Sequence, residues 1–183
     1  MSSPPPVPVP DTKDWTWVIH RPCPDCGFDP QAVEHEDVPR LTRRYAEVLR
    51  AAAARPTADV RPGPATWSPL EYACHVRDVC DLFARRLHRM LTEDDPEFAD
   101  WDQDETALTE RYWEQEPQEL QQQLRANAEN IATAFAGVSA HRWQRPGRRS
   151  NGSVFSVDTF ARYFLHDLAH HAWDVTGDPQ PAR

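Results

Sequence analysis

Apolar side chains recur at helical spacing in four stretches of the chain, and each stretch carries start or stop signals. The first predicts a helix over about 37–54, capped by Asp37, because its apolar positions follow a period near 3.6. The second begins at a capping box, with Ser68 as the N-cap, Pro69 at the first helical position and Glu71 as the reciprocal partner. These signals predict two long helices in the first half of the chain.

Two more long helices are expected in the second half. Pro117 opens one of them, and Gly137 is placed to end it. Ser156 can cap the other, which runs to about residue 175 and closes at Gly177. Four long amphipathic helices joined by loops predict an all-α fold, an up-down four-helix bundle.

The segments outside these helices have no regular apolar pattern. Residues 1–14 are rich in proline and predict an extended tail, and 15–36 predict an irregular packed segment around a Cys-x-x-Cys turn. We assign 37–183 to the bundle domain. Within it, an acidic loop precedes a short helix over 106–115, and the VFSV run at 154–157 is too short to indicate a strand.

Length and charge exclude several classes of protein. The chain has 183 residues, enough for one domain with a proper core, and a formal charge of −9. An acidic protein is a poor match for nucleic acid, and no apolar run approaches the ~20 residues of a membrane span. The first residues lack the pattern of a signal peptide, so we expect a cytoplasmic protein with neither a nucleic-acid nor a membrane partner. A homodimer through helix faces is left open.

Three histidines on two of the expected helices are candidate metal ligands. His166 and His170 lie one turn apart on one face of the fourth helix, and His75 lies on the apolar face of the second. Three imidazoles would leave a coordination position free, as in a catalytic metal site. Imidazole nitrogen suits zinc first, and also nickel or iron. The alternative is that all three are ordinary core or surface histidines.

Neighbouring polar residues are expected to support such a site without binding the metal. A metal-bound histidine usually donates its second ring N–H to an acceptor, for which Asp78, Asp167 and Asp174 are available. We expect Asp167 to point off the ligand face. His171 follows His170 directly and therefore points in another direction, so it is not expected to bind metal.

The same motifs resemble a known family. His75 followed by Asp78 on the second helix, with an H-D-x-x-H motif from His166 to His170 on the fourth, resembles the DinB/YfiT-like four-helix superfamily over about 35–176. The resemblance implies a divalent metal bound by the three histidines. The WSPLEYACHVRD and HHAWD sequences are most similar to the mycothiol-associated branch, whose members include metal-dependent thiol transferases and isomerases.

On this resemblance we expect a mycothiol-type S-transferase, in which a metal-bound thiolate attacks a small electrophile. Asp78 and Tyr163 would orient a water or transfer a proton. Arg145, Arg148 and Arg149, just before the fourth helix, could hold a carboxylate of the thiol or of its acceptor. The alternatives are a solvated basic loop for the arginines, and for the protein a metal-activated hydrolase or a non-catalytic bundle, with or without metal.

The Cys-x-x-Cys turn allows a second metal site. Cys23 and Cys26 have the spacing of a zinc knuckle, and the nearby His20 and His35 could complete a Cys2His2 set. A single such turn is weak evidence, so a plain packed turn is the simpler interpretation.

Overall fold

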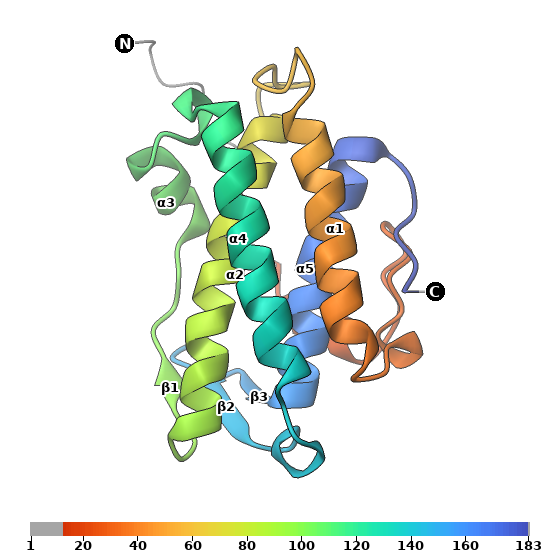
Figure 1. Ribbon diagram of the computed structural model, residues 1–183, viewed down its shortest axis with the longest axis vertical. Coiled ribbons are helices and arrows are strands. Elements are labelled where there is room, and N and C mark those ends of the chain that lie inside the picture. The colour runs from red at the N-terminus through yellow and green to blue at the C-terminus, as the bar shows by residue number, and fades with distance from the viewer. Residues whose placement is uncertain (1–12, 183) are drawn as a thin grey trace.

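The computed structural model describes residues 13–182, and the rest of the predicted N-terminal tail, residues 1–12, lies outside this range. Within it, four long helices form a bundle: α1 (Asp37–Ala53), α2 (Pro69–Thr92), α4 (Pro117–Ala136) and α5 (Val157–Thr176). Helices α4 and α5 both pack on α1 and α2 (Figure 1). The all-α four-helix bundle predicted from the sequence is therefore confirmed. No helix among the described residues is long and apolar enough to cross a membrane.

The helix boundaries follow the capping signals closely. Ser68 accepts a hydrogen bond from the Glu71 backbone N–H, and the Glu71 side chain accepts from the Ser68 N–H, which completes the expected capping box. Ser156 caps α5 in the same way, and Gly177 ends it with φ of 74°, a conformation that favours glycine. Asp37 is not the N-cap of α1. It is the first helical residue, and its carboxylate accepts from the Glu34 N–H just upstream.

One connection departs from a simple alternation of helix directions. The segment 93–116 carries α3 (Gln103–Thr109) and η3 (Tyr112–Glu114) and returns along the length of the bundle, so that α2 and α4 run in the same direction (Figure 1). This long return brings Trp101 and the start of α3 against α2, where they face α5 across the pocket described below.

A small three-stranded sheet lies at one end of the bundle. Strand β2 (Pro146–Arg149) pairs in parallel with β1 (Glu97–Phe98) and antiparallel with β3 (Val154–Ser156). The VFSV run, which is too short to indicate a strand by itself, forms β3 because β2 supplies its hydrogen-bonding partner. The hairpin leads directly into α5 and fixes where that helix begins.

The N-terminal segment is packed rather than loose. It contains two short 3-10 helices, η1 (Thr16–Ile19) and η2 (Pro30–Ala32). Besides η3, one more 3-10 helix of the described residues, η4 (Ala140–Arg142), follows α4. Val18 and Phe28 are fully buried in the common core. Arg162 on α5 donates a hydrogen bond to the Pro30 carbonyl, so the segment is held on the same helix that carries the candidate histidines.

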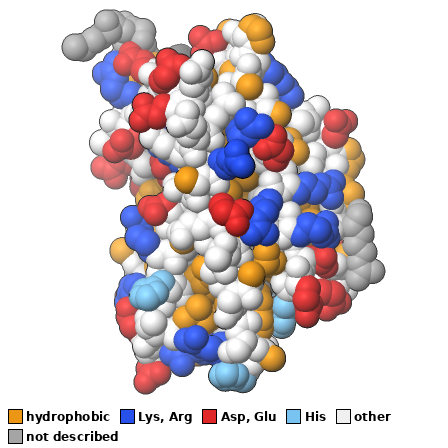
Figure 2. Space-filling view, in the orientation of Figure 1, with side chains coloured by type: hydrophobic (Ala, Val, Ile, Leu, Met, Phe, Trp, Pro, Cys, Tyr) orange, Lys and Arg blue, Asp and Glu red, His pale blue; other side chains and the backbone are white. Residues whose placement is uncertain are grey.

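The surface shows acidic and basic side chains interspersed over the helices (Figure 2). Arg43 on α1 and Glu129 on α4 form one such pair across the bundle, with Nε and Oε2 2.7 Å apart. This pattern is typical of a solvated exterior.

Candidate metal centres

Helix α5 carries two adjacent rows of metal-binding side chains. His166 and His170 form one row, and Asp167 and His171 form the next, each pair four residues apart. Because successive residues are rotated by about 100° around a helix, the two rows face different neighbours. One row faces the N-terminal segment and the other faces α2, and each row meets further donors there.

The first group, which we call the α2–α5 site, consists of His75, Asp167 and His171. Their donor atoms all lie within 4.8 Å of one another. Asp167 Oδ1 is 3.5 Å from His75 Nε2 and 3.7 Å from His171 Nε2. Two imidazoles from different helices therefore converge on one carboxylate oxygen.

Several polar atoms of this site are buried without a hydrogen bond. Among the described residues, both ring nitrogens of His75 and the Oδ1 atom of Asp167 have no hydrogen-bond partner. Buried polar groups are nearly always satisfied, and an absent ion is one established reason for an exception. The ring of His75 is held by two indoles, with Trp101 stacked at 5.4 Å and 12° and Trp67 tilted at 5.3 Å.

The protonation states suit a cation at this place. Burial lowers the pKa of His75, so its imidazole is neutral at pH 7 and offers a lone pair. Burial alone would raise the pKa of Asp167, but the neighbouring His75 and His171 outweigh it and lower that pKa to about 2. The site therefore offers the neutral imidazole of His75 and the carboxylate of Asp167, beside the ring of His171.

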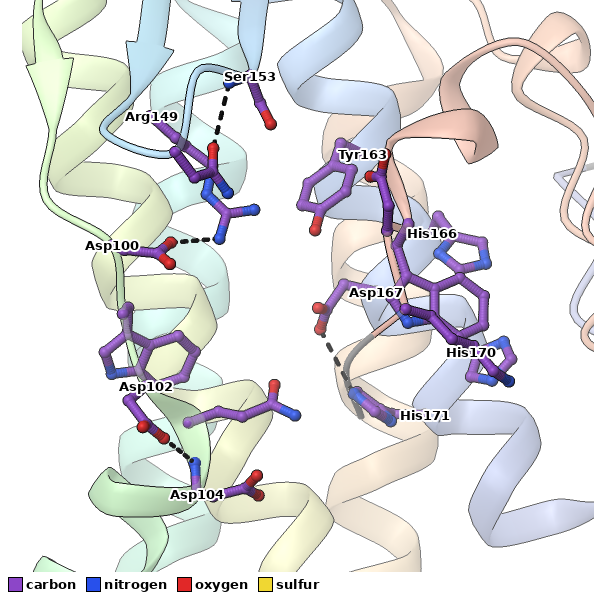
Figure 3. Close-up of a pocket in the computed structure, with 16 residues that line it drawn as sticks. Asp100, Asp102, Asp104, Arg149, Ser153, Tyr163, His166, Asp167, His170 and His171 are labelled. Atoms are coloured by element: carbon purple, nitrogen blue, oxygen red, sulfur yellow. Dashed lines mark hydrogen bonds and ion pairs between the residues drawn. The ribbon is translucent and has the colours of Figure 1, made fainter. Parts of the chain in front are cut away.

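The α2–α5 site borders a pocket of about 750 Å³. Asp167 and His171 line one side, on α5, and Asp100 and Arg149 lie across from them in Figure 3. Arg149 donates to Asp100 and lowers the pKa of that carboxyl. The charged residues of the lining are mostly acidic: Asp14, Asp100, Asp102, Asp104 and Asp167, against Lys13 and Arg149.

The second group, which we call the Cys–His site, consists of Cys23, Cys26, His166 and His170. These four donors also lie within 4.8 Å of one another, with Cys23 Sγ 3.7 Å from His170 Nδ1. Cys23, Cys26 and His166 are buried and His170 is half-buried. Burial lowers the pKa of His166 to about 3, to which the adjacent His170 contributes. This imidazole is therefore also neutral at pH 7.

The structure does not group the three histidines predicted to bind one metal. His166 and His170 do come together, but their partners are Cys23 and Cys26, while His75 belongs to the α2–α5 site. We expected His75 to lie with His166 and His170, and in the structure the neighbouring row of α5 lies beside it instead. The 100° step between neighbouring residues means that His171, not His170, is the second imidazole near His75, with ring centroids 4.8 Å apart.

The expectations for Asp167 and His171 are corrected by the same geometry. Both were expected to point away from the metal ligands, and both are donors of the α2–α5 site. Their i, i+4 spacing was visible in the sequence, but nothing local distinguished that row from the row of His166 and His170. In the structure the two rows differ because the N-terminal segment packs against His166 and His170.

The two residues proposed as catalytic are placed differently. Tyr163 lines the pocket, and burial raises the pKa of its phenol, which is therefore protonated at neutral pH. Asp78 is not among the residues that line the pocket. Its carboxylate accepts two hydrogen bonds from Arg77, at 2.7 and 3.0 Å, and a third from the Tyr112 hydroxyl at 2.5 Å. Asp78 thus links Arg77 on α2 to Tyr112 in η3, away from the pocket lining.

Of the three arginines proposed to bind a carboxylate, only Arg149 reaches the pocket. Arg145 donates to the carbonyls of Met90 and Glu93 at the end of α2. Arg148 pairs with Asp95. Arg145 and Arg148 therefore hold the β2 segment against the end of α2 and the loop that follows it, and their use as anion ligands in the pocket is not supported.

The histidines proposed to complete the cysteine turn are not its partners. His35 is stacked on Trp143, with ring centroids 3.9 Å apart, and its Nε2 lies 2.9 Å from Asp158 Oδ1. His20 is exposed and is not part of the Cys–His site. The histidines that lie beside Cys23 and Cys26 are 140 to 147 residues further along the chain.

The fold and the two sites together define a helical-bundle protein with candidate metal centres between its segments. The sequence matches the DinB superfamily over residues 36–175, and the chain therefore belongs to the DinB superfamily. YfiT from Bacillus subtilis has a similar structure, with a TM-score of 0.69 and 13% identity over 80% of this chain and 88% of YfiT. At that identity the likeness shows the shared fold. No curated protein sequence matches the chain.

Proposed function

We propose that this protein is a metal-dependent enzyme of the DinB superfamily that holds one divalent metal at His75, Asp167 and His171. The observation that carries the proposal is the convergence of these donors at the wall of a pocket of about 750 Å³, where buried ring nitrogens of His75 and the Oδ1 atom of Asp167 make no hydrogen bond among the described residues. Two imidazoles and one carboxylate are a ligand set of catalytic zinc and of non-haem iron. Three protein ligands leave coordination positions for a substrate.

A metal bound there would lower the pKa of a coordinated thiol or water and so supply a nucleophile at neutral pH. The residues around it prepare the site. Trp67 and Trp101 hold the ring of His75, and Asp167 supplies one negative charge. Tyr163 presents a protonated phenol at the pocket, where it can donate a hydrogen bond to a bound substrate.

The first candidate reaction is S-transfer, in which the sulfur of a small thiol of the mycothiol type forms a bond to an electrophilic carbon and displaces its leaving group. The family resemblance of the two histidine motifs supports it, and the pocket is large enough for a small-molecule ligand. Hydrolysis is the second candidate. A carboxylate among the ligands occurs in zinc hydrolases, and YfiT is described as a probable metal-dependent hydrolase.

The metal site is tested by counting metals in the purified protein by mass spectrometry. His171→Ala should lose one metal equivalent relative to the native protein, because it removes one of three ligands. His88→Ala is the matched control, since His88 is exposed on α2 and should change nothing. Equal metal content in the native protein and in His171→Ala would refute the assignment of the α2–α5 site.

The reaction is tested with the metal-loaded protein in two assays, thioether formation from a thiol and an alkyl halide, and hydrolysis of small esters and amides. A product that depends on metal and is lost in His171→Ala identifies the nucleophile. Thioether without hydrolysis supports the transferase, and hydrolysis without any need for thiol supports the hydrolase. No metal-dependent product in either assay, from protein that holds its metal, would contradict a catalytic role of these two kinds.

A further inference from the structure

The Cys–His site has the composition of a closed metal centre. Two sulfur and two imidazole donors meet within 4.8 Å, and Cys2His2 is a common ligand set of structural zinc. Zinc bond lengths of about 2.3 Å to sulfur and about 2.0 Å to nitrogen place tetrahedral sulfur and nitrogen ligands about 3.6 Å apart. Cys23 Sγ and His170 Nδ1 are 3.7 Å apart. This pair is therefore already at ligand spacing.

The turn that carries the cysteines is shaped to present both sulfurs on one side. Gly27 has φ of +73°, and its N–H donates to the Cys23 carbonyl at 3.0 Å. The Cys23 N–H in turn donates to the Phe28 carbonyl at 2.9 Å, and the Gln180 N–H donates to the Cys26 carbonyl at 2.7 Å. The turn is thus fixed by three backbone hydrogen bonds, so little ordering is required when a metal binds.

Burial provides a second, independent observation. Cys23 is 2% exposed, Cys26 is fully buried and His166 is 4% exposed. His166 Nε2 is buried and has no hydrogen-bond partner among the described residues, and both cysteines are free thiols. Two thiolates would cancel the charge of a divalent cation, so the occupied cluster is neutral and suits a buried position.

We propose that Cys23, Cys26, His166 and His170 bind one structural zinc ion, with the two thiol protons released to solvent. Four protein ligands leave no open position, so this metal is not a second catalytic centre. It joins the N-terminal segment to α5, whose ligands lie 140 to 147 residues further along the sequence. Trp15 lies in that segment, 5.4 Å from the ring of His166 and 5.1 Å from that of His170, and lines the pocket. The zinc therefore fixes one wall of the pocket.

The proposal is tested by zinc content in the full chain. Cys26→Ser should lose one zinc per chain, and Cys80→Ala should lose none, because Cys80 is an equally buried thiol outside the site. The effect is separable from the α2–α5 site. His75→Ala should lose the metal of that site and keep the zinc of the Cys–His site. Zinc retained in full by Cys26→Ser overturns the proposal.

A measurement on the unaltered chain covers the case in which Cys26→Ser fails to fold. Cobalt(II) added to the metal-stripped protein should give the sulfur-to-cobalt charge-transfer absorption of a thiolate complex and the strong visible bands of tetrahedral cobalt. The same bands should appear in His75→Ala. Cobalt bound without sulfur charge transfer, or cysteines alkylated equally fast with and without zinc, would overturn the proposal.

Discussion

Replacing Arg61 by alanine should remove the ion-pair partner of a buried carboxylate. That carboxylate belongs to Glu71, at the start of α2 and one turn before His75. The Arg61 guanidinium bonds both carboxylate oxygens of Glu71, and the two side chains are 13% and 2% exposed. The other described partner of this carboxylate is the Ser68 N–H, at 2.8 Å. Arg61→Ala therefore leaves a charge with little solvent and one hydrogen bond.

The expected cost follows from this burial. Removing one partner of a buried ion pair typically costs about 3–5 kcal/mol, because the remaining charge is uncompensated. For a domain of this size each kcal/mol lowers the melting temperature by about 2–4 °C, so we expect a fall of roughly 6–20 °C. Urea unfolding followed by tryptophan fluorescence measures the free energy, and a calorimetric scan measures the midpoint.

The matched control is Arg85→Ala, which removes an arginine side chain from an exposed ion pair within α2. Arg85 Nη1 is 2.9 Å from Asp81 Oδ2, and the side chains are 67% and 46% exposed. Exposed i, i+4 pairs contribute about 0.3–0.5 kcal/mol. A loss below about 1 kcal/mol for Arg61→Ala, or equal losses in both variants, would refute the reasoning that burial decides the value of this pair.

Three further outcomes are expected. Gly147→Ala should destabilise the protein by about 1–3 kcal/mol in chemical unfolding, because the added Cβ would lie 2.8 Å from Met90 Cγ. Gly63→Ala is the control: its added Cβ would have no atom within 4 Å, so its stability should be within about 0.5 kcal/mol of the native protein. Burial raises the pKa of Tyr45 to about 12, above its unfolded value of about 10. The free energy of unfolding, compared with that of Tyr45→Phe, should therefore be constant below pH 10 and fall between pH 10 and 12, where only the unfolded phenol ionises. A difference between the two proteins that does not change with pH would contradict this. Ser156→Ala should cost about 1 kcal/mol in urea unfolding by removing the N-cap of α5, and no change would show that the cap is dispensable.

The helices were predictable because their signals are local. A Ser–Pro–x–Glu start at Ser68 and a glycine just past the end of α5 each satisfy backbone groups within a few residues, so the sequence alone locates them. Gly177 ends α5 through its own backbone conformation, which does not depend on the rest of the fold. The same locality explains the agreement at Pro117 and Gly137, and it explains why the bundle class followed from counting the helices.

The sheet and the parallel course of α2 and α4 were not predictable in this way. Strand β1 has two residues and β3 has three, and both depend on β2 for hydrogen bonds. The direction of α4 depends on the route of the segment 93–116, which is set by the packing of Trp101 and Tyr112 and not by any periodic pattern. Tertiary context determines these features.

The candidate site shows the same division within a single helix. The run from His166 to His171 offers two rows of ligands with identical spacing, and no property of α5 alone decides which row faces α2. The N-terminal segment makes the choice. Its cysteines occupy the row of His166 and His170, which leaves Asp167 and His171 for His75. The donors of both sites can therefore be found in the sequence, but which of them meet depends on how residues 15–36 and α2 pack against α5.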